Sequence, residues 1–149
     1  MKVKLLGYQE RKEHKPANTS EYQDFDEGGI YWNLFFKSEH DNYFRVTVSE
    51  TYGSCGSGYT SASWGDINKI EELNKVPKNL VKPIKDVFIE LLQNNILNTK
   101  FLENKEPWDA QVEQLLSTDG ELIAQSTGNG GCSYYPSGVA SINKELFNN

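Results

Sequence analysis

Large apolar side chains recur at every second position in two stretches of the chain, residues 30–37 and 43–49. The residues concerned are Ile30, Trp32, Leu34 and Phe36, then Phe44, Val46 and Val48. A period of two is that of a β-strand with one buried face. The polar residues 38–42 between the two stretches are typical of a turn. The pattern therefore predicts a β-hairpin with one face in the core.

Weaker patterns extend this hairpin on both sides. Residues 2–8 indicate a first strand, and the small polar residues 59–64 indicate a strand that pairs back on the hairpin. For residues 66–74, a continuation of that strand and a helix both stay open. Residues 9–29 are polar and contain Pro16 and a glycine pair, which predicts a long loop or arm.

A helical pattern begins at Pro83, a residue type that suits the first turn of a helix. Apolar side chains follow at positions i, i+3, i+4, i+7 and i+8, which form one stripe on a helix: Ile84, Val87, Phe88, Leu91 and Leu92. We therefore predict an amphipathic helix over about residues 83–95, packed on one face of the sheet.

The C-terminal third is ambiguous between two periods. Residues 107–117 have apolar positions at helical spacing, but Asp119-Gly120 is a hairpin signal, so we favour a second hairpin and leave the helix open. A last strand is expected over about residues 138–147. Together the patterns predict the α+β class. We expect one domain over residues 1–149, with a single antiparallel sheet of about five to seven strands built from hairpins and at least one helix on a face.

The charge distribution narrows the classes of partner. The chain has 15 basic and 21 acidic residues, and only two of the basic residues are arginines. Residues 1–20 carry a net charge of +3, so the rest of the chain is strongly acidic. Because phosphate backbones are repelled by such a surface, direct binding of nucleic acid is not expected, whereas a basic protein partner is consistent with it.

Neither a signal peptide nor a membrane-spanning segment is expected. The apolar run at the N-terminus is short, and nowhere does the sequence contain the stretch of ~20 apolar residues that a spanning helix needs. We therefore expect a cytoplasmic location. The two cysteines make no disulfide framework there.

The sequence around Cys55, "GSCGS", resembles the signature of papain-like proteases over four residues. In register, however, the nucleophile would fall on Gly58, so this resemblance is rejected. A thiolate nucleophile would also need a histidine nearby, and the chain offers only His14 in the arm and His40 in the hairpin turn. We assign no catalytic residue, and a cysteine-dependent enzyme is the second alternative.

Metal and cofactor sites are not expected either. The candidate zinc ligands stand at positions 14, 40, 55 and 132, with no pair at the short spacing of structural zinc sites. Gly53, Gly56 and Gly58 match no phosphate-binding motif, although amides in a glycine-rich turn can bind an anion.

Two glycine-rich stretches share a cysteine, a following tyrosine and a later Ala-Ser pair, "GSCGSGYTSASW" and "GGCSYYPSGVASI". The plain interpretation is two turns that need positive φ. The functional hypothesis is a binding edge made of both stretches. Its candidate residues are Cys55, Tyr59, Trp64, Cys132, Tyr134 and Tyr135.

These observations favour a non-enzymatic, acidic binding protein that engages a macromolecular partner. The Asn- and Lys-rich composition is typical of an AT-rich genome, such as that of a low-GC bacterium or its phage. Small acidic single domains from phages or mobile elements often act as inhibitors of host proteins, which is the setting we expect. The first alternative is a small-molecule binder or sponge for a nucleotide-like ligand, held by the glycine-rich residues 53–58 and 128–133. The oligomeric state is not determined by the sequence.

Overall fold

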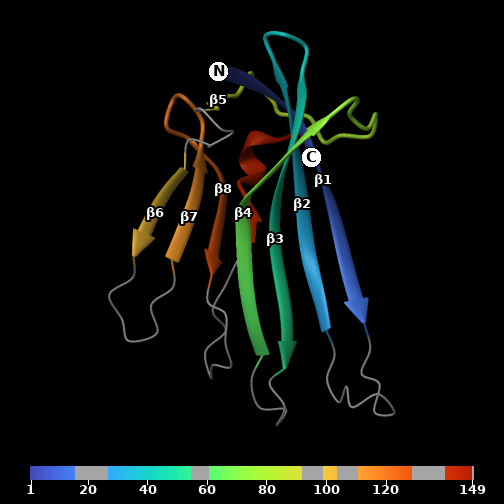
Figure 1. The fold of residues 1–149 in the computed structure, drawn as a ribbon, viewed down its shortest axis with the longest axis vertical. Coiled ribbons are helices and arrows are strands. Elements are labelled where there is room, and N and C mark those ends of the chain that lie inside the picture. The colour runs from blue at the N-terminus through green and yellow to red at the C-terminus, as the bar shows by residue number, and fades with distance from the viewer. Residues whose placement is uncertain (16–26, 55–60, 92–98, 104–110, 129–139, 149) are drawn as a thin grey trace.

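Nine β-strands, arranged in two antiparallel sheets, make up most of the described chain (Figure 1). This computed structural model describes residues 1–15, 27–54, 61–91, 99–103, 111–128 and 140–148. One sheet has the order β4-β3-β2-β1-β5 and the other the order β6-β7-β8-β9. The strands are β1 Lys2–Lys15, β2 Glu27–Ser38, β3 Tyr43–Ser54, β4 Ser61–Leu73, β5 Phe88–Glu90, β6 Thr99–Glu103, β7 Gln111–Leu116, β8 Leu122–Gly128 and β9 Ala140–Ile142.

The predicted α+β class is wrong, because the described residues contain no α-helix. They hold only one short 3₁₀ turn, η3, at Lys144–Leu146. The predicted single sheet is wrong as well, since the strands form two sheets. Ile84 and Lys85 form a bend, and β5 lies in the middle of the predicted helix.

The same apolar residues satisfy a strand pattern in the structure. Val87, Ile89 and Leu91 alternate into the core, whereas Ile84, which the helix would have buried, is 63% exposed. Short apolar runs fit both periods, and pairing of β5 with Lys2–Lys4 of β1 decides between them. The remaining predicted helix residues, 92–95, lie outside the described part.

The two sheets share one hydrophobic core. The first sheet contributes the alternating residues of the hairpin, with Leu34, Phe36, Val46 and Val48 almost fully buried. The second sheet and the C-terminal segment contribute a facing set: Leu115, Ile123, Ala124, Ile142, Leu146 and Phe147. Strand β4 contacts β8, and β9 contacts β3 and β2. The predicted hairpin and its buried face are therefore confirmed.

Two described hairpin turns have the same construction. In the turn between β2 and β3, Ser38 N–H donates to Asn42 O (2.8 Å), and Ser38 Oγ accepts from Asn42 N–H (3.1 Å). In the turn between β7 and β8, Ser117 makes the equivalent bonds with Glu121, both 2.9 Å long. In each turn the fourth of the five residues has a positive φ, which is 64° at Asp41 and 86° at Gly120. Both are three-residue loops closed by a left-handed residue.

The ambiguous segments also resolve as strands. Residues 66–73 continue β4, so the helix alternative there is wrong, and residues 111–116 form β7, so the favoured second hairpin is confirmed. The last strand is shorter than predicted, with only residues 140–142 in β9. Strands β1 and β2 also extend into the predicted arm, through residues 9–15 and 27–29, while residues 16–26 lie outside the described part.

A long connection between β4 and β5 joins opposite edges of the first sheet. It passes β1 so closely that Tyr8 and Val81 exchange two backbone hydrogen bonds of 3.0 Å. Gly7 forms a bulge at this point with φ 154°, and a Cβ there would lie 2.6 Å from Val81 O. Glycine is required because the two backbones approach too closely for a side chain.

Tyr8 is buried and stacks edge-on against Phe147, with ring centroids 4.6 Å apart. Burial, and to a lesser degree the charge of Glu10, raise the pKa of Tyr8 above its ordinary value of 10.0. The phenolate forms more readily in the unfolded chain than in the folded one. The stability that comes from keeping Tyr8 protonated is therefore fully present below pH ~10 and is lost as pH rises through the folded pKa.

We expect Tyr8→Phe to lose less stability above that pH than the wild type, measured by urea unfolding between pH 8 and 11. An identical decline in both proteins would contradict this.

Among the described residues, no helix is long and apolar enough to cross a membrane.

Candidate functional site

The described strand ends place the two glycine-rich stretches at one end of the molecule. Within each sheet neighbouring strands are antiparallel, and in Figure 1 strands β1, β3, β6 and β8 all run toward the same end. We call this the connection end, because the connections 16–26, 55–60, 104–110 and 129–139 leave and re-enter the strands there. The turns after Ser38 and Ser117 lie at the opposite end, the turn end.

Five of the predicted binding residues lie outside the described part of the chain: Cys55, Tyr59, Cys132, Tyr134 and Tyr135. The sixth, Trp64, is on β4, where its backbone pairs with Thr51 of β3, but its side chain is outside what the structure describes. The structure therefore brings the attachment points of the two stretches to one end and leaves the predicted edge itself as a prediction.

Those attachment points come from both sheets. Ser54 ends β3, Ser61 begins β4 and Gly128 ends β8. Strand β8 contacts both β3 and β4 across the core. The two stretches that resemble each other in sequence thus leave neighbouring strands of facing sheets at the same end.

The two histidines lie at opposite ends. His14 is opposite Gly28 near the end of β1, at the connection end, and His40 is in the turn after Ser38. A histidine in that turn is a full strand length from the end of β3 at Ser54, as the sequence indicated. Among the described residues, no three His, Cys, Asp or Glu side chains gather closely enough to hold a metal ion.

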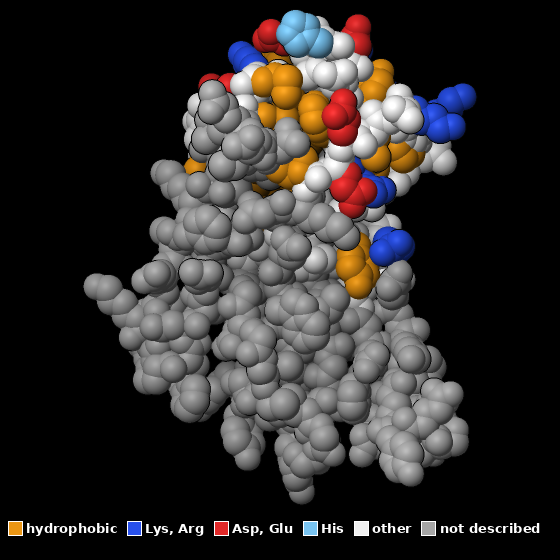
Figure 2. All heavy atoms as spheres, viewed as in Figure 1, with side chains coloured by type: hydrophobic (Ala, Val, Ile, Leu, Met, Phe, Trp, Pro, Cys, Tyr) orange, Lys and Arg blue, Asp and Glu red, His pale blue; other side chains and the backbone are white. Residues whose placement is uncertain are grey.

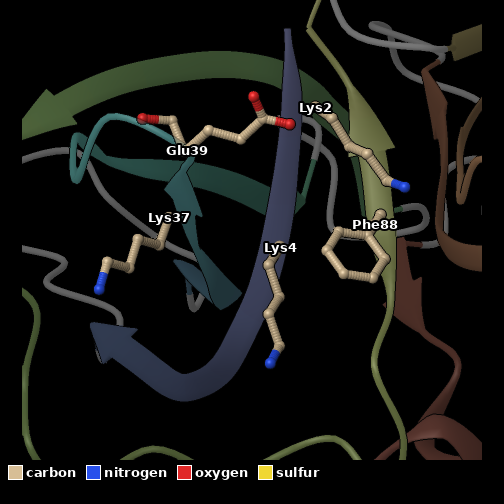
Figure 3. Close-up of a pocket in the computed structure, with 6 residues that line it drawn as sticks. Lys2, Lys4, Lys37, Glu39 and Phe88 are labelled. Carbon is tan, nitrogen blue, oxygen red and sulfur yellow. The ribbon is translucent and has the colours of Figure 1, made fainter.

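The turn end carries a shallow hollow of about 300 Å³ (Figure 3). It is lined by Lys2, Lys4, Lys37, Ser38, Glu39 and Phe88. Sequence reasoning missed it because Phe88 was assigned to a helix and because the lysines come from β1 and β2. The only available signal was the alternation of lysine with apolar residues at the start of β1.

Two of the three lysines around this hollow form ion pairs, and the third lies over an aromatic ring. Lys4 Nζ lies 3.0 Å from Asp86, and Lys37 Nζ lies 3.2 Å from Asp41. The hydrogen bond to Asp41, and then its charge, raise the pKa of Lys37 above its ordinary value. Lys2 Nζ lies 4.4 Å from the centre of the Phe88 ring, an attractive cation–π distance.

The ammonium groups do not converge on one point. In Figure 3 the side chains of Lys2, Lys4 and Lys37 point in three different directions. Ser38, the hydroxyl on the wall, already accepts N–H groups of its own turn. At the turn end, Figure 2 shows hydrophobic, basic and acidic side chains intermixed. The hollow is thus a mixed surface, not a preformed site for one anion.

A second charged group lies on the outer face of the first sheet. Phe35, Arg45 and Glu71 are opposite one another on β2, β3 and β4, and Arg45 pairs with Glu71. Phe35 is only 2% exposed, although it lies on the face away from the shared core. An ion pair on strands next to a buried aromatic residue indicates a structural contribution.

Comparison with known proteins finds no matching family model, no matching curated protein and no matching solved structure.

Proposed function

We propose that this chain is a non-enzymatic binding protein that engages a protein partner through its connection end. The supporting observation is that β1, β3, β6 and β8, from both sheets, all finish at that end (Figure 1). Connections held by packed strands are a common way to display binding residues, because the strands fix where each connection begins.

The sequence of the four connections fits such a surface. Five acidic residues stand against one basic residue, Lys105. Six aromatic residues also fall there: Tyr22, Phe25, Tyr59, Trp108, Tyr134 and Tyr135. Aromatic side chains contribute disproportionately to binding energy, and acidic groups steer a basic partner toward the surface. This chemistry favours a basic protein over nucleic acid.

The proposal extends to the biological setting. A small acidic domain that presents aromatic residues at one end suits an inhibitor that blocks a basic surface of a host protein, as phage and mobile-element proteins do. We place this interaction in the cytoplasm.

Affinity capture tests the proposed surface. We expect the full chain to retain a partner from bacterial lysate at about 50 mM salt and to lose most of it at about 300 mM, because exposed charges are screened. Replacing Tyr59, Tyr134 and Tyr135 together by serine should weaken capture of that partner at least tenfold, since buried interface tyrosines are typical hot spots. The matched control replaces Glu39 and His40, both exposed at the turn end, by alanine and should retain the partner.

Loss of capture in the turn-end variant alone would contradict the proposal, and so would the absence of any partner at low salt. The alternative, a nucleotide-like ligand, is supported by the same geometry, because Gly53 and Gly128 lie in the last two residues of β3 and β8. A thermal shift of several degrees with ATP or GTP, without any protein captured, would replace the first proposal by the second.

A further inference from the structure

The outer edge of β1 has no pairing partner over its second half within the part of the chain that the structure describes. On that side β1 pairs with β5 at Lys2–Lys4 and meets Val81 at Tyr8, and Gln9 Nε2 donates to Asn79 O (3.3 Å). Among the described residues, those from Glu10 to Lys15 pair only with β2, on the inner side of the strand. Figure 1 shows this half of β1 at the margin of the first sheet.

Strand alternation identifies which backbone groups face outward. The N–H of Tyr8 donates to Val81 O, and the carbonyl of Tyr8 accepts from Val81 N–H. The backbone polar groups of Tyr8 therefore point away from β2. In an antiparallel ladder every second residue has the same direction, which places the N–H and C=O groups of Glu10, Lys12 and His14 on the open edge. No described group bonds to the outward backbone groups of Glu10 or Lys12. This edge is about 20 Å long, by the rise of six strand residues.

The side chains along this edge are mainly basic, although the whole chain is acidic. Arg11 and Lys12 are exposed, and the Arg11 guanidinium lies 4.8 Å from the centre of the Tyr31 ring. The acidic residues of this edge are Glu10 and Glu13, against Arg11, Lys12 and Lys15. The Glu10 carboxylate already faces Lys12 Nζ (3.4 Å) and Lys144 Nζ (3.9 Å).

Two further lysines flank the place where the edge begins. Lys78 and Lys82 are exposed and stand next to Asn79 and Val81, the residues that contact Gln9 and Tyr8. In Figure 2 basic side chains appear on the side of the molecule where β1 lies in Figure 1. A strand that continues along β1 would therefore meet more basic than acidic side chains.

We propose that the edge of β1 from Glu10 to Lys15 binds an extended acidic segment of a partner protein, which adds to the first sheet as an antiparallel strand. The main-chain groups of Glu10 and Lys12 bond the segment, and Arg11, Lys12 and Lys144 face its carboxylates. This proposal does not rest on the proposed function.

Fluorescence anisotropy with defined peptides measures this binding on the full chain. The probe is a labelled peptide of four Glu-Val repeats, and the controls are four Lys-Val repeats and the Glu-Val peptide methylated on alternate backbone nitrogens. We expect the first to bind at least tenfold more tightly than either control. Amide hydrogen exchange at Glu10 and Lys12 should slow when the Glu-Val peptide is bound.

A pair of variants at Lys12 separates charge from strand addition. Lys12→Ala removes one cation and should weaken the peptide a few-fold. Lys12→Pro removes the same cation and also the outward N–H, and proline is tolerated where an edge N–H faces solvent. We expect Lys12→Pro to bind at least tenfold more weakly than Lys12→Ala while both unfold at similar urea concentrations.

Equal affinities of the two Lys12 variants, or equal affinities of the methylated and unmethylated peptides, would overturn the proposal. Should Lys12→Pro fail to fold, the methylated peptide still makes the same test. Binding of a labelled thymidine oligonucleotide, with no binding of the Glu-Val peptide, would also overturn it, because the edge would then recognise phosphates and not a strand.

Discussion

Replacing Ile89 by alanine should lower the free energy of unfolding by about 3 kcal/mol, the range measured for buried large-to-small changes. Ile89 lies in the middle of β5, is fully buried and belongs to the shared core. Its side chain enters the core because it alternates with the half-buried Phe88 and Glu90. Urea unfolding followed by tryptophan fluorescence should show the midpoint lowered by about 1–2 M.

Ile84→Ala is the matched control, since it makes the same chemical change five residues earlier. Ile84 is 63% exposed, so we expect a change within about 0.5 kcal/mol. A helix over residues 83–95 predicts the opposite order, because Ile84 lies on its apolar stripe and Ile89 does not. A larger loss for Ile84→Ala than for Ile89→Ala would therefore restore the helix and reject β5.

Gly7→Ala should lower the free energy of unfolding by about 3 kcal/mol, as much as Ile89→Ala does. The new Cβ would lie 2.6 Å from Val81 O and 2.8 Å from Leu80 Cβ, and one of these atoms is backbone that cannot rotate away. The φ of 154° adds conformational strain, and crowding of a packed site adds a cost of about 1–3 kcal/mol. The expected structural effect is separation of the β4–β5 connection from β1, visible as faster amide exchange at Tyr8 and Val81.

Gly120→Ala separates these two costs. Gly120 also has positive φ, 86°, but a Cβ there would meet nothing within 4 Å. An alanine at this position meets no steric clash and is penalised only for its left-handed conformation. We therefore expect the free energy of unfolding to fall by about 1 kcal/mol. Equal losses at Gly7 and Gly120 would show that the close approach of Val81 to β1 is not rigid in solution.

The hairpin of β2 and β3 was predictable because its signal is local. Apolar and polar residues alternate over long stretches, and the intervening polar residues can form only a turn. The β7–β8 hairpin was predictable for a similar reason, since Asp119-Gly120 outweighs a helical spacing that covers only a few residues. Strand β5 was not, because its apolar run fits both periods and its pairing partner is more than eighty residues away.

The candidate binding residues show the same division. The resemblance between the stretches around Cys55 and Cys132 is a property of the sequence, but whether they share one end depends on the directions of β3 and β8 in different sheets. The hollow between β1, β2 and β5 had only the alternation of lysine with apolar residues at the start of β1 as a local signal, and the outer edge of β1 had none. Both depend on where strands stop pairing.

By itself, the sequence determined which residues alternate into a core, where the two described hairpins turn, and that acidic residues outnumber basic ones. Only the tertiary structure decided that the strands form two sheets and that residues 88–90 are a strand. It also decided that half of β1 has no outer partner among the residues described. The physical reason is that side-chain periodicity is encoded within a few residues. Strand pairing is decided by hydrogen bonds and packing between segments that are distant in the chain.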